Sequence, residues 1–146
     1  MAKFKKVTYQ EGQIEAVAYD ASGKETGRSK LVSASGKTKI SLRPECQSLR
    51  ANGQDLCFLN IDLVGENGIT KSSVDQVLKV EVTGAGCLQG YGSARPNIAD
   101  DFVSDQHKTF LGKSLAVIRA GYETGCIHVK VSGEGLESVE TDISVS

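Results

Sequence analysis

The sequence contains no tryptophan, only two prolines and no long apolar run. The longest apolar run, near residues 115–118, is far shorter than the ~20 residues that a membrane-spanning helix needs. The formal net charge is −1, and basic and acidic residues are mixed along the whole chain, so no basic surface is expected. We therefore expect neither nucleic acid nor a membrane as a partner.

Global disorder is excluded by the same composition, because 39% of the residues are hydrophobic and proline is scarce. A chain of 146 residues holds one domain, or one and a fraction, and is long enough to bury a core without metals or disulfides. Polar residues follow the first lysines, where a secretory signal needs an apolar segment, so we expect a cytoplasmic protein.

The four cysteines, at positions 46, 57, 87 and 126, are widely spaced and form no Cys-x-x-Cys pair. Zinc sites usually take their ligands in close pairs, so no metal is expected. Cys57 alternates with leucine and isoleucine, which predicts a small buried hydrophobe. Cys126 alternates with His128 and Lys130, which predicts a position on the solvent face. We expect the thiols to be reduced.

From residue 39 onward, short runs with a period of two recur between turn signals. The strongest run covers residues 55–64, and further apolar rows lie at 78–82, 114–120, 127–131 and 139–145. Nothing has the length and the 3.6-residue period of a helix. About seven strands predict an all-β fold, an immunoglobulin-like antiparallel β-sandwich over residues 39–146, without the disulfide and core tryptophan of antibody domains.

Residues 1–38 contain too few strands to close a sandwich. Two runs, at residues 13–20 and 25–32, flank a turn of small and polar residues. A small set of hairpin strands is only marginally stable alone, so we interpret residues 1–38 as the C-terminal strands of a partial β domain whose earlier strands are missing. We expect their apolar face to be covered by the second unit or by a second copy of the chain.

Residues 84–112 form the longest expected connection, interrupted by several glycines. Asp100, Asp101 and Asp105 gather there, either as ligands of calcium or a sugar or as a solvated acidic turn. The turn is favoured, because calcium needs six to eight oxygens in a defined loop and no such motif is present. Tyr91 and Phe102 could stack on a sugar ring or cap the end of the sandwich.

No catalytic residue is predicted. His107 and His128 have no serine or cysteine nucleophile motif beside them, so both are expected to be surface histidines. The glycine clusters at 84–86 and 90–92 lack the strand-to-helix context of a phosphate loop, so no cofactor is expected. The residues alone therefore predict a non-enzymatic β module with one elaborate loop.

Several stretches of the sequence, taken in order, resemble a known family. V-T-Y-Q-E-G-Q-I-E-A-V-A-Y-D-A-S-G-K-E at 7–25 resembles the end of the small β domain that follows the catalytic barrel in bacterial family 2 glycoside hydrolases, the β-galactosidase group. Six further motifs resemble the C-terminal immunoglobulin-like domain of those enzymes. They are L-R-P-E at 42–45, A-N-G-Q-D-L-C-F-L-N-I-D-L at 51–63, V-T-G-A-G at 82–86, G-Y-G-S-A-R-P at 90–96, F-L-G-K-S-L-A-V-I-R-A-G at 110–121 and E-G-L at 134–136.

The resemblance implies a non-catalytic C-terminal accessory domain of a cytoplasmic bacterial, β-galactosidase-like enzyme. Its implied partners are the upstream domains of the parent enzyme, with carbohydrate and a second copy of the chain as further candidates. The family's two catalytic glutamates lie in the barrel, and no stretch here resembles either motif, so the chain itself is expected to be inactive. Cys57 departs from the small apolar residue expected at its position.

Two alternatives to the accessory domain remain open. In a carbohydrate-binding module, the sugar would contact Tyr91, Arg95, Asp101 and Phe102, which are also the candidate contacts to another domain. In an immunoglobulin-like spacer of a bacterial surface protein, residues 40–146 would recur in tandem copies.

Overall fold

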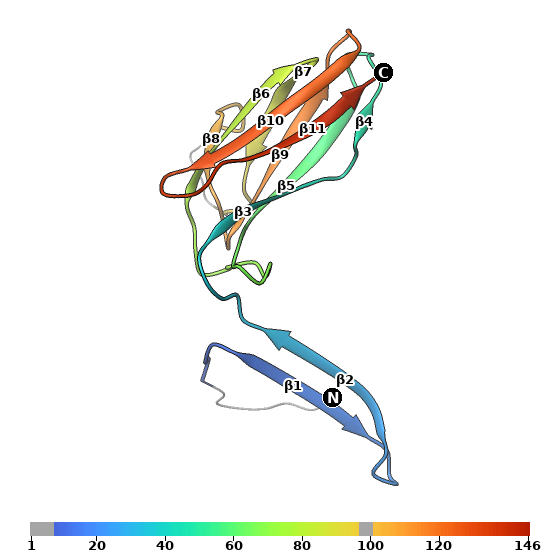
Figure 1. Cartoon of the computed structure of the whole chain (residues 1–146), viewed down its shortest axis with the longest axis vertical. Helices are drawn as coiled ribbons and strands as arrows, with labels where there is room; N and C mark the ends of the chain where they lie inside the picture. Colours follow the sequence, from blue (N-terminus) through green and yellow to red (C-terminus); the bar gives the residue numbers. More distant parts are fainter. Residues whose placement is uncertain (1–7, 97–100) are drawn as a thin grey trace.

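The computed structural model describes residues 8–96 and 101–146, and within these ranges the chain forms strands and connections without a helix (Figure 1). No helix of the described residues is long and apolar enough to cross a membrane. The strands are β1 (Gln13–Tyr19), β2 (Glu25–Val32), β3 (Lys39–Pro44), β4 (Ser48–Leu49), β5 (Leu56–Val64), β6 (Val77–Gly84), β7 (Gly86–Gly92), β8 (Gln106–Lys108), β9 (Lys113–Ala120), β10 (Gly125–Gly133) and β11 (Val139–Val145).

The strands from β3 to β11 form a sandwich of two sheets. One sheet has the order β4-β11-β10-β6-β8 and the other has the order β3-β5-β9-β7. All pairs in both sheets are antiparallel except β4 with β11, which is parallel. The predicted all-β sandwich is therefore confirmed, with nine strands over the described part of residues 39–146 instead of about seven.

The core lies between the two sheets and consists of the inward rows of alternating strands. Cys57, Leu59, Ile61 and Leu63 on β5 are each at most 1% exposed, as their alternation predicts. Burial of this kind stabilises the fold by roughly 1.5–3 kcal/mol for each large aliphatic side chain. The other buried hydrophobic residues are Ile40, Leu49, Leu78, Val80, Tyr91, Ala116, Ile118, Ala120, Ile127, Val129, Val131, Ile143 and Val145.

The stretch from 84 to 112 is not a single loop, which corrects the expectation from the sequence. It contains β7, which pairs with β9 at the edge of one sheet, and β8, which pairs with β6 at the edge of the other. The glycines of β7 hid the strand, because they interrupt the alternation of apolar and polar side chains. The register of β7 also shifts between Leu88 and Gly90, and such a bulge further obscures the pattern.

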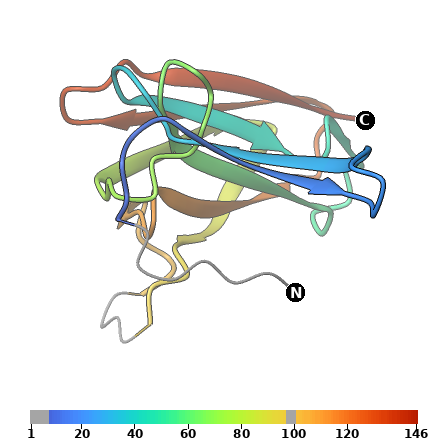
Figure 2. The ribbon, with the colours of Figure 1, turned by 90° about the horizontal axis from the view of Figure 1, so that it is seen from below.

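The strands β1 and β2 form a separate antiparallel hairpin that stands off one end of the sandwich (Figure 1). Seen from below, the hairpin (blue) runs across the end of the sandwich, and the segment after β7 (yellow) projects on the side opposite β11 (red) (Figure 2). Ile14 and Leu31 are direct cross-strand partners and are 58% and 73% exposed. The sandwich therefore does not cover this apolar face, contrary to one of the two expected arrangements.

The base of the hairpin is attached to the turn between β5 and β6. Asn67 Nδ2 donates to the Ser33 carbonyl at 2.9 Å, and Lys71 Nζ donates to the Gly36 carbonyl at 2.5 Å. The backbone amide of Glu66 donates to the Ser35 carbonyl at 2.8 Å. These bonds join the linker to the sandwich, while the strands of the hairpin extend into solvent.

Candidate functional site

A groove of about 870 Å³ lies beside β7 and β9 and is lined by two of the four predicted contact residues, whereas Arg95 and Asp101 are not part of its lining. Tyr91 and Phe102 line it, and its other lining residues are small or apolar, with one asparagine and one lysine. No carboxylate, histidine or cysteine is among the described lining residues, so the groove has no acid–base pair for glycoside hydrolysis. The lining is Asn60, Thr70, Ser72, Gly90, Tyr91, Gly92, Ser93, Ala94, Phe102, Phe110, Leu111, Lys113, Ser114, Leu115 and Val117.

Tyr91 lies beneath the groove as part of the core, since it is only 1% exposed. Its hydroxyl is 3.2 Å from Ser114 Oγ, and each of these groups can act as the donor. Burial raises the pKa of Tyr91 to about 12, because the charged phenolate would lose its solvation. The ring therefore supports the groove from below and is not open for stacking on a sugar.

Phe102 is the exposed aromatic residue at the groove, with 57% of its surface accessible. Its ring lies over Gly92, where an added Cβ would be 2.5 Å from Phe102 Cδ1. Its carbonyl accepts a hydrogen bond of 2.9 Å from the Tyr91 amide. Glycine at position 92 is thus what allows the phenyl ring to lie against β7, a role that the sequence did not reveal.

His107 is buried, not a surface histidine as the sequence predicts. It is 4% exposed and lies on β8, directly opposite Leu78 of β6. Its ring meets the Tyr91 ring edge-on at 5.4 Å between centroids and stacks on Phe102 at 6.2 Å. The short strand β8 carries no recognisable alternation, so the inward direction of this side chain could not be read from the sequence.

Arg95 connects the segment after β7 to the rest of the sandwich. Its Nη2 atom is 3.4 Å from Asp75 Oδ2, and its guanidinium lies 5.9 Å from the centroid of the Phe110 ring. Asp75 Oδ1 in turn accepts a 3.0 Å hydrogen bond from the Gly112 amide. Asp75 therefore holds two segments together, and nothing in the pattern around position 75 predicted this.

The acidic residues of the same segment make structural contacts. Asp101 accepts hydrogen bonds from the Val103 and Ser104 amides at 3.0 and 2.9 Å, which is an Asx-type turn. Asp105 lies 3.9 Å from Lys79 Nζ. Asp100 lies outside the described residues. Asp101 therefore forms a turn with its own backbone neighbours, and Asp105 lies within ion-pair distance of a lysine.

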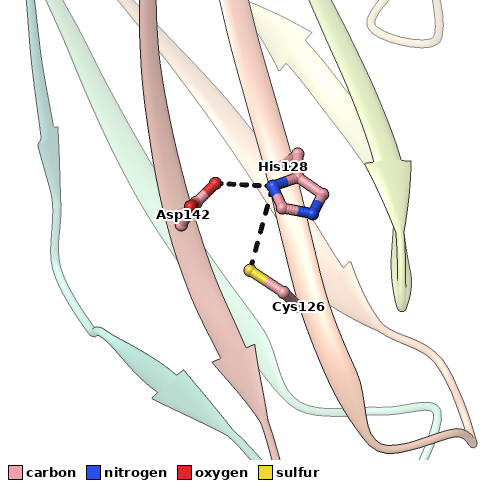
Figure 3. A group of neighbouring side chains, drawn as sticks. All are labelled: Cys126, His128 and Asp142. Atoms are coloured by element: carbon pink, nitrogen blue, oxygen red, sulfur yellow. Dashed lines mark hydrogen bonds and ion pairs between the residues drawn. The ribbon is translucent and has the colours of Figure 1, made fainter.

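A different group of ligand-type side chains lies on β10 and β11, where the sequence predicted none. Cys126, His128 and Asp142 place their donor atoms within 4.8 Å of one another (Figure 3). All four cysteines of the chain have free thiols, and Cys57 is buried as predicted. Burial, together with the nearby Cys57, raises the pKa of the Cys46 thiol to about 12.

The family model described as glycoside hydrolase family 2 C-terminal domain 5 matches residues 40–142, which is more than half of the chain. The chain belongs to this family. The match begins in β3 and ends in β11, so this family 2 C-terminal domain is the sandwich that carries the groove. The resemblance to family 2 glycoside hydrolases is confirmed.

This family 2 C-terminal domain is similar to parts of much longer enzymes. It is 28% identical to the beta-galactosidase BoGH2A of Bacteroides ovatus over 139 residues, which cover 95% of this chain and 16% of that enzyme. A solved family 2 member from Bacteroides cellulosilyticus has a TM-score of 0.90 and 30% identity, covering 96% of this chain and 18% of the other. A beta-glycosidase from Bacteroides vulgatus shares the fold, with a TM-score of 0.83, 24% identity and coverage of 95% and 18%. The chain spans less than a fifth of each relative.

Proposed function

We propose that the chain is a non-catalytic accessory domain that packs on the upstream domains of a β-galactosidase-like glycoside hydrolase. The observation that carries this proposal is the exposed hairpin. An isolated two-stranded hairpin is at best marginally stable in water. Here one face of the hairpin carries Ile14 and Leu31, and both side chains are largely exposed to solvent. A preceding β domain would cover that face and pair with its free edges.

The two faces of the hairpin differ in a way that suits docking on one side. Ala16 and Ala18 continue the face of Ile14 and Leu31, and their cross-strand partners are the small residues Ser29 and Gly27, so this side carries no charged side chain. The opposite face carries Arg28, which makes ion pairs with Glu15 at 2.7 Å and Glu25 at 2.9 Å. The charged face has ion-pair partners within the hairpin, whereas Ile14 and Leu31 on the apolar face stay largely exposed beside the described residues, which supports a protein contact on the apolar side.

The groove supports the second part of the proposal, that the domain shapes substrate access or contacts between subunits. Its lining is apolar, and Phe102 is exposed beside it. Apolar concave surfaces of this kind favour burial against another surface. The groove contributes contact area and no bond-breaking groups, so the 146-residue chain alone should not hydrolyse chromogenic β-galactosides or β-glucuronides.

The experiment compares the 146-residue chain with a longer protein that contains it. Ile14→Asp combined with Leu31→Asp should leave the unfolding temperature of the 146-residue chain nearly unchanged, because both side chains are exposed there. In the longer protein the same pair should lower the unfolding temperature and the activity. Lys30→Gln, on the opposite face of the hairpin, is the matched control. Equal behaviour of the double variant in the two proteins would overturn the proposal.

A carbohydrate-binding role is the second candidate, because Phe102 is an exposed aromatic ring beside a groove. Calorimetric titration with galactosides should then give heat that Phe102→Ala removes. Tyr91→Ala is unsuited to this test, since it would open a hole in the core. Flat titrations across the galactosides would contradict carbohydrate binding, and the accessory role would be the remaining candidate.

A further inference from the structure

The outer face of the sheet β4-β11-β10-β6-β8 carries three side chains that coordinate metals elsewhere in proteins (Figure 3). His128 of β10 and Asp142 of β11 are direct partners in the antiparallel register. Cys126 precedes His128 by two residues on β10, so both side chains point to the same face. Strand pairing therefore brings together Cys126 and Asp142, which lie 16 positions apart in the sequence.

The donor atoms of the three side chains converge on one region. His128 Nδ1 is 2.7 Å from Asp142 Oδ1 and 3.9 Å from Cys126 Sγ. The two side chains of the His128–Asp142 pair are 60% and 66% exposed, so an ion can approach from solvent. All three donor atoms lie within 4.8 Å of one another, a spacing at which one ion can contact them all.

The arrangement differs from a nucleophile–histidine–acid triad. In a triad the acid contacts one ring nitrogen and the nucleophile contacts the other. Here the thiol and the carboxylate both face Nδ1 of His128, so the ring cannot relay a proton between them. Convergence of three donors on one point suits coordination of an ion.

Neighbouring pairs on the same face show what an ordinary surface contact looks like here. Lys130 Nζ lies 3.3 Å from Glu140 on the next outward-facing pair of positions, and Lys79 lies 2.9 Å from Glu81. Exposed pairs of this kind contribute about 0–1 kcal/mol each. The His128–Asp142 pair would be one more of them without the sulfur of Cys126 beside the same nitrogen.

We propose that Cys126, His128 and Asp142 bind one Zn²⁺ ion, through Sγ, Nδ1 and a carboxylate oxygen, with a fourth position open to water. Zinc accepts these three ligand types in tetrahedral sites with bonds of about 2.0–2.3 Å, and a thiolate ligand disfavours Mg²⁺ and Ca²⁺. The thiolate and the carboxylate together balance the charge of the ion. The strand β10 is hydrogen-bonded to β11 on one side and to β6 on the other, so the backbone of the site is fixed. Binding of the ion therefore needs only rotation of the side chains.

The test uses the 146-residue chain and cobalt as a spectroscopic probe for zinc. Addition of Co²⁺ should give one bound ion per chain, a sulfur-to-cobalt charge-transfer band and visible absorption typical of a tetrahedral site, and Zn²⁺ should displace it. Cys126→Ser should abolish the charge-transfer band. His128→Asn and Asp142→Asn should each weaken Zn²⁺ binding at least ~10-fold, the scale on which zinc sites respond to loss of a supporting contact.

Two control variants separate this site from adventitious binding. Cys87→Ser removes an exposed thiol on the other sheet, and Glu140→Gln removes a carboxylate from the neighbouring pair. Both should leave the band and the affinity unchanged. All these positions have exposed or partly exposed side chains, and circular dichroism will show whether each variant is folded. Binding no tighter than in the triple variant of the three ligands, or a band that Cys126→Ser leaves intact, would overturn the proposal.

Discussion

At the scale of single residues, Asp55, just before β5, is a carboxylate that accepts several hydrogen bonds. It accepts hydrogen bonds from Arg50 Nε at 2.9 Å, from Arg50 Nη2 at 3.0 Å and from Asn52 Nδ2 at 2.8 Å. The Arg50 guanidinium first, and then the Asn52 amide, hold the pKa of Asp55 well below its usual range. Asp55 therefore connects the residues before β5, and these contacts favour its charged form.

The lowered pKa of Asp55 predicts how stability depends on pH. Because the folded pKa lies below the unfolded value of about 3.9, the stabilising contribution is complete above the unfolded value and is lost progressively as the pH falls from there through the folded pKa. Asp55→Asn should therefore lower the urea midpoint at pH 7, and its difference from the natural chain should shrink below about pH 4. Urea unfolding across pH measures this, with Glu137→Gln, at an exposed position, as the control. A difference that is constant with pH would contradict the prediction.

Residues whose roles depend on the sequence period were predicted well, and those that depend on partners far away were not. The alternation on β5 correctly placed Cys57, Leu59 and Ile61 in the core, because a period of two determines which face a side chain takes. His107 was predicted on the surface, but it is buried. The prediction failed because a strand of three residues is too short to show an alternation. The proximity of His128 and Asp142 depends on register, which alternation alone does not specify.

At the scale of elements, β7 shows how a strand can exist without a strand pattern. Three of its seven residues are glycines, and it ends at Gly92 under the Phe102 ring. The strand is nevertheless specified by its pairing with β9 and by Tyr91, whose side chain fills the core. Tyr91 and Phe102 of the predicted contact set line the groove, and their role as contacts stays a prediction. The strand β7 and the inward direction of His107 could be seen only in the structure.

Gly92→Ala tests the packing of Phe102 on β7. The added Cβ would meet the phenyl ring, so we expect a loss of about 1 kcal/mol in unfolding free energy, typical of a single substitution that displaces a neighbour. The loss should be smaller when Phe102 is already alanine, since contacting residues are energetically coupled. A double-mutant cycle by urea unfolding measures this coupling.

Gly27→Ala on β2 is the control for Gly92→Ala, because an added Cβ there meets nothing within 4 Å. It should leave the free energy of unfolding nearly unchanged. Equal losses for Gly92→Ala with and without Phe102 would show that the ring does not rest on this glycine.

At the scale of the whole molecule, stability is concentrated in the sandwich. The buried hydrophobic cluster lies entirely within the residues from β3 to β11, whereas β1 and β2 are exposed along nearly their whole length. The strand count and the family resemblance both divide the chain into residues 1–38 and 39–146, and this division into domains stays a prediction. The exposure of the hairpin could not be read from the sequence, because alternation predicts an apolar face without saying what covers it.

This unequal distribution predicts two independent responses to mutation. Ile61→Ala should lower the free energy of unfolding of the sandwich by about 2–5 kcal/mol, because it opens a cavity in a fully buried site. Leu31→Ala, at an exposed position of the hairpin, should cost far less. Amide hydrogen exchange in the 146-residue chain should speed up across the sandwich in Ile61→Ala and stay unchanged and fast in β1 and β2. Protection of the hairpin that falls together with that of the sandwich would contradict this.

The short linker at residues 33–36 also has a geometric consequence. Asn67 and Lys71 hold it at one end of the sandwich, so the sandwich extends from that point like a lever from a pivot. A small rotation at the pivot becomes a large displacement at the far end, where β10 begins. A neighbouring domain that bound the hairpin would thereby fix the orientation of the sandwich. Substitutions in the linker would change that orientation without changing the fold of either part.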